Sequence, residues 1–257
     1  AAALERASLA LEMVSAKTAT ETERVRNTLL ASVSHDFRTP LSSILGSATS
    51  LIDYGDKLDP EAKKDLLGQI KKEAEGLDEM VRNLLAITRI DAGALELRRD
   101  WVDLREVAER VVSAARRHGA QQHIEINLPS DLPLVRADAT LAEQAIGNVV
   151  ANAIVHTPPE TRIVLDADVA PNGIALRVTD DGPGIPADGL PLIFDKFVKG
   201  PESGPSGADG SQGTGLGLAI AKGIMEAHGG AIKVESPAQN SRGARFVMSF
   251  PREGAPV

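Results

Sequence analysis

Residues 180–186 read Asp-Asp-Gly-Pro-Gly-Ile-Pro and directly follow a run of strand-forming residues at 174–179. Glycine has no Cβ, so the backbone at Gly182 and Gly184 can approach a flat ligand closely. A second glycine-rich run, Gly213-Thr214-Gly215-Leu216-Gly217-Leu218, opens a predicted helix. Successive N–H groups at a helix N-terminus favour phosphate. Each run alone also fits an ordinary turn, but together they favour a nucleotide-binding α/β domain.

Short strands and helices alternate around these runs from Trp101 onward. The hydrophobic pattern predicts helices at 102–117 and 141–156 and strands at 163–169, 174–179, 231–235 and 245–250. Pro171-Asn172-Gly173 is typical of a hairpin turn between two of these strands. Residues 200–213 are rich in glycine and poor in apolar residues, which predicts a mobile loop.

The first 92 residues carry a helical pattern instead. The apolar positions form a heptad-like stripe with one extra four-residue step: Leu30, Val33, Phe37, Leu41, Ile44, Ala48 and Leu51. Pro40 lacks an N–H, which predicts a soft point near residues 36–40. Asp59-Pro60 predicts the start of a second helix that ends near Gly93. One hairpin cannot bury so long a stripe, so a homodimeric four-helix bundle is expected.

Composition excludes several classes of protein. The 257 residues carry 28 Lys plus Arg against 36 Asp plus Glu, a net charge of −8 that argues against nucleic-acid binding. The absence of cysteine excludes disulfides and thiolate chemistry. No apolar run is long enough to span a bilayer, and the N-terminus lacks a signal-peptide pattern. We therefore expect a cytoplasmic piece of a longer protein, with any membrane contact made by a region upstream.

Ser34-His35-Asp36-Phe37-Arg38-Thr39-Pro40 places a histidine beside the apolar stripe. His35 is two residues from both Val33 and Phe37, so on a helix it points away from the stripe. Asp36 can accept the Nδ1 proton, which leaves a lone pair on Nε2 for nucleophilic attack. Thr39, four residues on, shares the face of His35 and can orient a water. An isolated exposed histidine is usually only solvated, but here its neighbours favour the nucleophile.

His35-Asp36-x-Arg38-Thr39-Pro40-Leu41 resembles the phosphoacceptor box of sensor histidine kinases, and the resemblance extends over residues 25–251. It implies an α+β chain: a helical hairpin forming a dimeric four-helix bundle, then an α/β sandwich with the Bergerat ATP-binding fold. The implied domains are a dimerisation and histidine phosphotransfer domain at 1–96, whose residues 1–27 form an incoming signalling helix, and a catalytic ATP-binding domain at 97–257.

The resemblance also implies a site for ATP and Mg²⁺. Asn148 and Asn152 share one helix face, with Asn152 holding Mg²⁺ and Asn148 supporting it. Asp180 would accept a hydrogen bond from the adenine 6-amino group, which selects against guanine. The further implied nucleotide contacts are His156, Gly182, Gly184, Ile185, Phe197, Lys199, Gly213, Thr214, Gly215, Leu216, Gly217 and Leu218. Phe194-Asp195-Lys196-Phe197, followed by Lys199-Gly200, and Trp101 most resemble the Kdp-type potassium sensor kinases.

The implied activity is ATP-dependent phosphorylation of His35, followed by phosphoryl transfer to an aspartate of a response regulator receiver domain. Thr39 would serve dephosphorylation of that regulator. Hydrolytic relatives carry a glutamate where this chain has Asn148, which cannot take a proton at neutral pH. Val155 replaces a basic residue that is common in the family, so Lys196, Lys199 or His156 would have to supply the charge. Two rivals stay open: an ATPase that is not a kinase, and a degenerate kinase acting as a scaffold or mainly as a phosphatase.

Overall fold

The computed structural model describes residues 37–170, 173–198, 214–238 and 242–251. The chain divides into two compact units, Ala1–Val81 and Arg82–Val257. Within the described ranges, no helix is long and apolar enough to cross a membrane. The incoming helix expected at 1–27 and the mobile loop expected at 200–213 lie outside these ranges.

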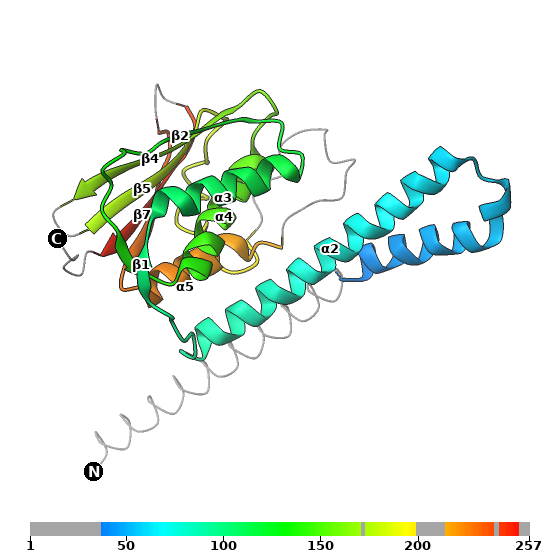
Figure 1. Ribbon diagram of the computed structural model, residues 1–257, viewed down its shortest axis with the longest axis horizontal. Coiled ribbons are helices and arrows are strands. Elements are labelled where there is room, and N and C mark those ends of the chain that lie inside the picture. The colour runs from blue at the N-terminus through cyan, green and yellow to red at the C-terminus, as the bar shows by residue number, and fades with distance from the viewer. Residues whose placement is uncertain (1–36, 171–172, 199–213, 239–241, 252–257) are drawn as a thin grey trace, which may run out of the picture. The chain divides into compact units, whose positions relative to one another are not determined.

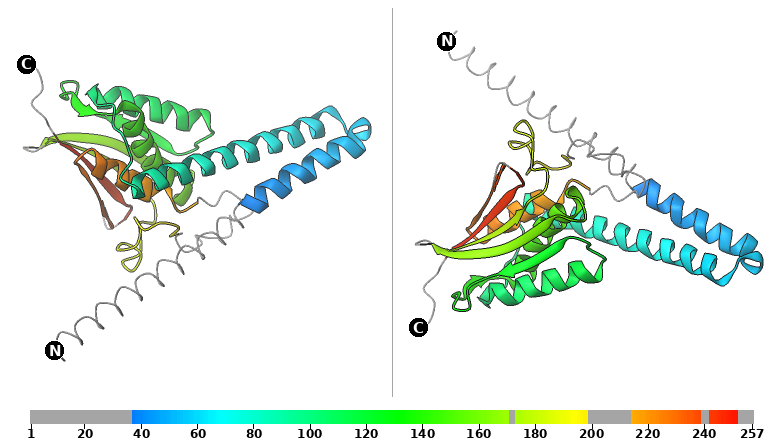
Figure 2. Two further views of the ribbon diagram at one scale, coloured as in Figure 1. Left: turned by 90° about the horizontal axis from the view of Figure 1, so that it is seen from below. Right: turned by 90° about the horizontal axis from the view of Figure 1, so that it is seen from above.

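The first unit contains a helical hairpin. A helix over 37–54 leads through the short 3-10 helix η1 (Gly55–Lys57) into α2 (Pro60–Asp91), and the two long helices run antiparallel in both views of Figure 2. The Asp59 carboxylate accepts a hydrogen bond of 2.7 Å from the N–H of Ala62, so the predicted start of α2 is confirmed. Residues 37–40 are helical and residue 36 lies outside the described ranges, so the soft point near 36–40 stays a prediction.

The second unit is built on a mixed sheet of five strands in the order β2-β4-β5-β7-β6 (Figure 1). Its strands are β2 (His123–Asn127), β4 (Arg162–Ala170), β5 (Gly173–Asp180), β6 (Ala231–Glu235) and β7 (Arg245–Pro251). Only β2 and β4 are parallel. Ala170 pairs with Gly173, which confirms the predicted β4–β5 hairpin, although residues 171–172 of its turn lie outside the described ranges.

Three helices cover one face of this sheet: α3 (Leu104–Arg117), α4 (Ala139–His156) and α5 (Gly217–Ala227), as Figure 1 shows. Alternate strand residues point into the core beneath the helices, including Ile163, Leu165, Ile174, Leu176, Val178, Phe246, Met248 and Phe250. The opposite face carries charged pairs such as Arg177 with Asp166. The expected α/β sandwich is confirmed, with helices on one face only.

Several boundaries differ from the sequence predictions. The helix predicted from Val102 begins at Leu104, because Asp103 caps it by accepting a hydrogen bond from the N–H of Arg105. Val102 instead ends strand β1 (Asp100–Val102), which pairs with β3 (Val135–Ala137). These two strands were not predicted, because segments of three residues show too little alternation. Strand β2 was not predicted either, although its sequence His-Ile-Glu-Ile-Asn alternates.

His228 has a structural role at the end of α5. It is buried, and its Nδ1 lies 2.8 Å from the carbonyl oxygen of Ile224. Its Nε2 accepts a hydrogen bond of 2.9 Å from the N–H of Asp138, the N-cap residue of α4. A single imidazole therefore joins the C-terminal end of α5 to the start of α4.

Candidate nucleotide-binding site

Asp180 is the last residue of β5 and is a buried carboxyl group, only 6% exposed. Its Oδ1 accepts hydrogen bonds from the N–H of Gly182 at 3.0 Å and the N–H of Ala244 at 3.3 Å. Burial raises the pKa of Asp180, and these two donors oppose the rise. Its Oδ2 accepts no hydrogen bond from any residue that the structure describes. One oxygen is thus fixed by the backbone, and the other remains available to a ligand.

The glycines after Asp180 stand where side chains would not fit. A Cβ on Gly182 would lie 2.7 Å from Cγ2 of Thr157. Gly184 has a φ of +79°, and a Cβ there would lie 2.9 Å from Oγ of Ser236. The next residue, Ile185, donates its N–H to that same hydroxyl at 2.8 Å. The loop therefore runs closely against Thr157 and Ser236, and the predicted approach to a flat ligand stays a prediction.

Helix α4 brings Asn148 and Asn152 to the same side of the helix, one turn apart. The Nδ2 of Asn148 donates a hydrogen bond of 3.0 Å to the carbonyl oxygen of Gly217, the first residue of α5. Asn152 is half-buried and forms no side-chain hydrogen bond with another described residue. Asn148 therefore holds the start of α5 in place, and no described residue occupies the Asn152 amide.

The N-terminus of α5 has the geometry expected of a phosphate-binding site. Its first helical hydrogen bond runs from the N–H of Ile220 to the carbonyl of Leu216, so the preceding amides have no acceptor within the helix. The Oγ1 of Thr214 accepts from the N–H of Leu216 at 3.3 Å. The side chains of Leu216 and Leu218 are buried, so only their backbone can face a nucleotide. Gly213 lies outside the described residues.

Phe197 lies next to this helix start and has a strained backbone, with a φ of +63°. Its N–H donates to the carbonyl of Gly215 at 2.8 Å. A Cβ on Gly215 would lie 2.8 Å from the backbone of Phe197, and Gly215 itself has a φ of +68°. The close approach of these two backbones explains why residue 215 must be glycine.

Of the three residues expected to compensate for Val155, the structure describes Lys196 and His156. Lys196 forms an ion pair with Asp91 at 2.5 Å. His156 is exposed, yet the protein around its ring lowers its pKa by desolvation, which favours the neutral imidazole at pH 7. Lys199 lies outside the described residues, and its contribution stays a prediction.

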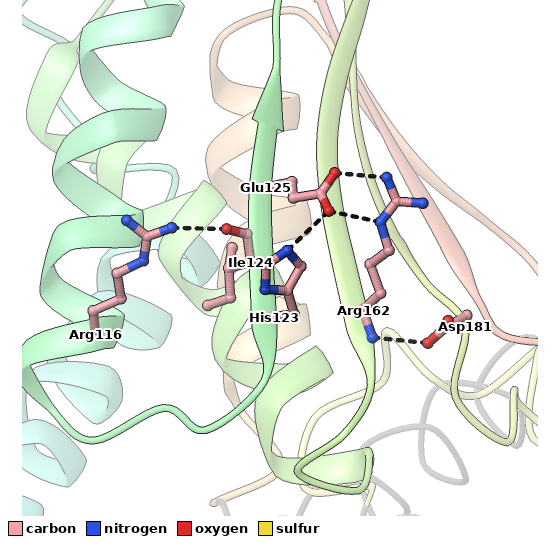
Figure 3. A network of polar contacts seen from close by, with 6 residues as sticks. All are labelled: Arg116, His123, Ile124, Glu125, Arg162 and Asp181. Atoms are coloured by element: carbon pink, nitrogen blue, oxygen red, sulfur yellow. Dashed lines mark hydrogen bonds and ion pairs between the residues drawn. The ribbon is translucent and has the colours of Figure 1, made fainter.

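A polar network fixes the end of β5 from the open face of the sheet (Figure 3). Glu125 of β2 accepts hydrogen bonds from the Arg162 guanidinium at 2.9 and 2.6 Å, and these bonds are the main cause of its lowered pKa. The N–H of Arg162 donates to Oδ1 of Asp181 at 2.8 Å, and the N–H of Asp181 donates to the carbonyl of Arg162 at 3.2 Å.

The sequence predicted no role for Asp181, Ser236 or Ala244. Asp181 lies within the motif 180–186 but its partner is distant in sequence, and no local pattern marks Ser236 or Ala244.

His35, Asp36 and Thr39 are the residues with predicted roles in phosphotransfer. Of these three, only Thr39 lies within the described ranges, where it is exposed on the helix 37–54. His35 and Asp36 lie outside them. The described residues hold no group of three or more His, Cys, Asp or Glu side chains able to bind a metal. A divalent ion here would therefore depend on the Asn152 amide and on the phosphate oxygens of a nucleotide.

Comparisons with known proteins agree with this geometry. Residues 137–254 match the family of histidine kinase-, DNA gyrase B- and HSP90-like ATPases, and residues 25–93 match the His Kinase A (phospho-acceptor) domain. The chain belongs to the sensor histidine kinases of two-component systems.

Among its relatives are two proteins named sensor protein KdpD, which confirm the Kdp-type resemblance. The KdpD of Clostridium acetobutylicum is 35% identical over 98% of this chain, and that of Escherichia coli is 34% identical over 99%. The chain spans only 28% and 27% of their lengths. The solved structure of full-length ShkA in complex with AMPPNP is 28% identical, with a TM-score of 0.62 over 88% of this chain and 46% of that one.

Proposed function

We propose that this chain is the catalytic core of a sensor histidine kinase that transfers the γ-phosphoryl group of ATP to His35. The observation that carries the proposal is the buried Asp180, which has one oxygen fixed by two amides and one oxygen free. With the carboxylate held in place through Oδ1, its other oxygen can accept a hydrogen bond from the 6-amino group of adenine and would oppose the 6-oxo group of guanine. ShkA, a relative of similar fold, was solved with AMPPNP. The proposed domains are 1–96 for phosphotransfer and 97–257 for ATP binding.

Asn152 and the start of α5 would hold the triphosphate. Bound Mg²⁺ would supply positive charge to the phosphate oxygens, with the Asn152 amide oxygen as its protein ligand. The amides at the start of α5 that have no acceptor within the helix would receive the phosphates, and the bond from Asn148 to Gly217 keeps that helix start in position. His156, Phe197 and Lys199 are proposed as further nucleotide contacts.

In the proposed reaction Nε2 of His35 attacks the γ-phosphorus. The bond from the γ-phosphorus to the bridging oxygen breaks and ADP leaves, while Asp36 accepts the Nδ1 proton. The phosphoryl group then passes to an aspartate of a response regulator receiver domain, and Thr39 would hold the water that later hydrolyses the phosphoaspartate. Asn148, which cannot act as a general base, disfavours direct hydrolysis of ATP by water.

Exposed apolar side chains on the hairpin support a homodimer. Leu41, Leu45 and Ile52 are 59%, 67% and 81% exposed, and Leu67 of α2 is 58% exposed. An apolar surface of this kind on a helical hairpin is covered when two hairpins form a four-helix bundle.

The test is incubation of the chain with γ-labelled ATP and Mg²⁺. The proposal predicts label on the protein that acid removes and base does not, together with slow release of inorganic phosphate. Adding a receiver domain should move the label to it. Rapid phosphate release without labelled protein would identify a hydrolytic ATPase instead, and nucleotide binding with neither product would identify a degenerate kinase.

A further inference from the structure

The loop that follows Asp180 is held by a second segment, the connection between β6 and β7. Gly243 of this connection donates its N–H to the carbonyl of Gly182 at 3.0 Å. A Cβ on Gly243 would lie 1.9 Å from the carbonyl oxygen of Asp180. The next residue, Ala244, donates its N–H to the Asp180 carboxylate. Gly243 and Ala244 therefore pack directly against Asp180 and hold the carboxylate that is proposed to bind adenine.

Ser236 is the side chain that links the two segments. Its hydroxyl accepts a hydrogen bond of 2.8 Å from the N–H of Ile185 and donates one of 3.1 Å to the carbonyl of Gly243. A hydroxyl is the smallest side-chain group that can donate and accept at once. Gly184 leaves the space in which this oxygen lies, because a Cβ there would approach it to 2.9 Å.

We infer that Ser236 is a positioning residue for adenine recognition: by bridging Ile185 and Gly243 it sets the loop 182–185 at the distance from Asp180 that the adenine ring requires. This inference rests on the proposed binding of ATP. Ser236 itself need not contact the nucleotide, because it acts through Ile185 and through Gly243 and Ala244. Removing the hydroxyl leaves the N–H of Ile185 and the carbonyl of Gly243 without their partner.

The test compares ATP and GTP binding by calorimetry for the wild type, Ser236→Ala and Ser236→Thr, with Ser249→Ala as the matched control. Ser249 is exposed on β7 and its hydroxyl forms no hydrogen bond with another described residue, so its variant removes the same group where no bridge exists. Loss of the bridging hydroxyl and of its two hydrogen bonds should weaken ATP binding by Ser236→Ala about three- to tenfold. The preference for ATP over GTP should fall, and Ser236→Thr should restore both.

Thermal unfolding without nucleotide separates positioning from general stability. The inference predicts that Ser236→Ala unfolds in one cooperative transition within about 8 °C of Ser249→Ala, since the loss of two part-buried hydrogen bonds changes the melting temperature only moderately in a domain of this size. Wild-type ATP affinity in Ser236→Ala would overturn the inference. So would a large drop in melting temperature that Ser236→Thr does not correct. If the wild type fails to bind ATP, or Asp180→Asn binds it equally well, the proposed function fails instead.

Discussion

The side-chain amide of Asn148 donates a hydrogen bond to the carbonyl oxygen of Gly217, which ties α4 to the first residue of α5. The segment 148–152 and the start of α5, which are proposed to hold the triphosphate, are therefore joined directly. Asn148 and Gly217 are 69 residues apart in sequence, and a Cβ on Gly217 would make ordinary contacts with the Asn148 side chain.

Asn148→Asp should destabilise this unit, because it places a carboxylate against the Gly217 carbonyl with no proton between them. We expect the free energy of unfolding to fall by about 1–3 kcal/mol, the cost of an unpaired polar contact. Urea unfolding followed by circular dichroism measures this change. Asn127→Asp, at the exposed end of β2, adds the same charge without such a contact and should be close to neutral. Equal effects in the two variants would show that charge alone is responsible.

We expect the Asp180 carboxylate to lower the stability of the nucleotide-free protein while strengthening ATP binding. Burial raises the pKa of Asp180 in the folded state. The free energy of unfolding is therefore highest below about pH 4, the ordinary pKa of an aspartate in an unfolded chain. It falls as the pH rises toward the raised pKa, because the buried carboxyl must then lose its proton. Asp180→Asn can keep both backbone donors on Oδ1 and should therefore raise the urea midpoint of the nucleotide-free protein at pH 7. The gain should shrink as the pH falls from that raised pKa toward about 4, and it should change no further below that. A lower midpoint at pH 7 would contradict this.

The same substitution should weaken ATP binding by about 1.5–3 kcal/mol, the scale of a hydrogen bond to a charged group. Calorimetry at pH 7 measures this loss. In the wild type, affinity for ATP should decline as the pH falls from 7 toward the raised pKa of Asp180, because the protonated carboxyl is a weaker acceptor. Asp180→Asn should lack that decline, and a parallel decline in both proteins would point to another group.

His228→Ala should lower the free energy of unfolding by about 2–4 kcal/mol, because it opens a cavity and leaves the Asp138 N–H unpaired. The ring also packs edge-on against Phe250, with centroids 6.4 Å apart. His118→Ala, at the exposed C-cap of α3, should change it by less than about 0.5 kcal/mol. Chemical denaturation of both variants checks the difference, and similar small losses would remove His228 from its structural role.

The sequence predicts those parts of the fold that rest on local chemistry. Asp59 and Pro60 mark the start of α2 because a cap and its helix are neighbours in the chain. Strand β6 has the predicted bounds, 231–235, because alternation is visible within one segment. The Ser236 bridge joins residues 51 apart, and the Ala244 bond to Asp180 joins residues 64 apart. Such contacts depend on which strands become neighbours in the sheet, and no local pattern encodes that.

Asp36 and Thr39 should serve different reactions. Asp36→Asn removes the group that accepts the Nδ1 proton and should mainly depress phosphorylation of His35. Thr39→Ala should keep that phosphorylation and lose most dephosphorylation of the regulator, because its hydroxyl only orients water. Both rates are measured for each variant with the cognate regulator. If Thr39 only sets the helix geometry before Pro40, Thr39→Ala would change both rates together or neither. Parallel losses of both rates in the two variants would contradict separate roles for Asp36 and Thr39.

The most direct test of the phosphoacceptor is the incorporation of γ-labelled phosphate into the wild type and His35→Gln, with ATP affinity measured on the same preparations. The account predicts acid-labile label on the wild type, none on His35→Gln, and equal ATP affinity in the two proteins, because acceptor and nucleotide are assigned to different domains. Acid-labile label that persists in His35→Gln would show that another residue accepts the phosphoryl group.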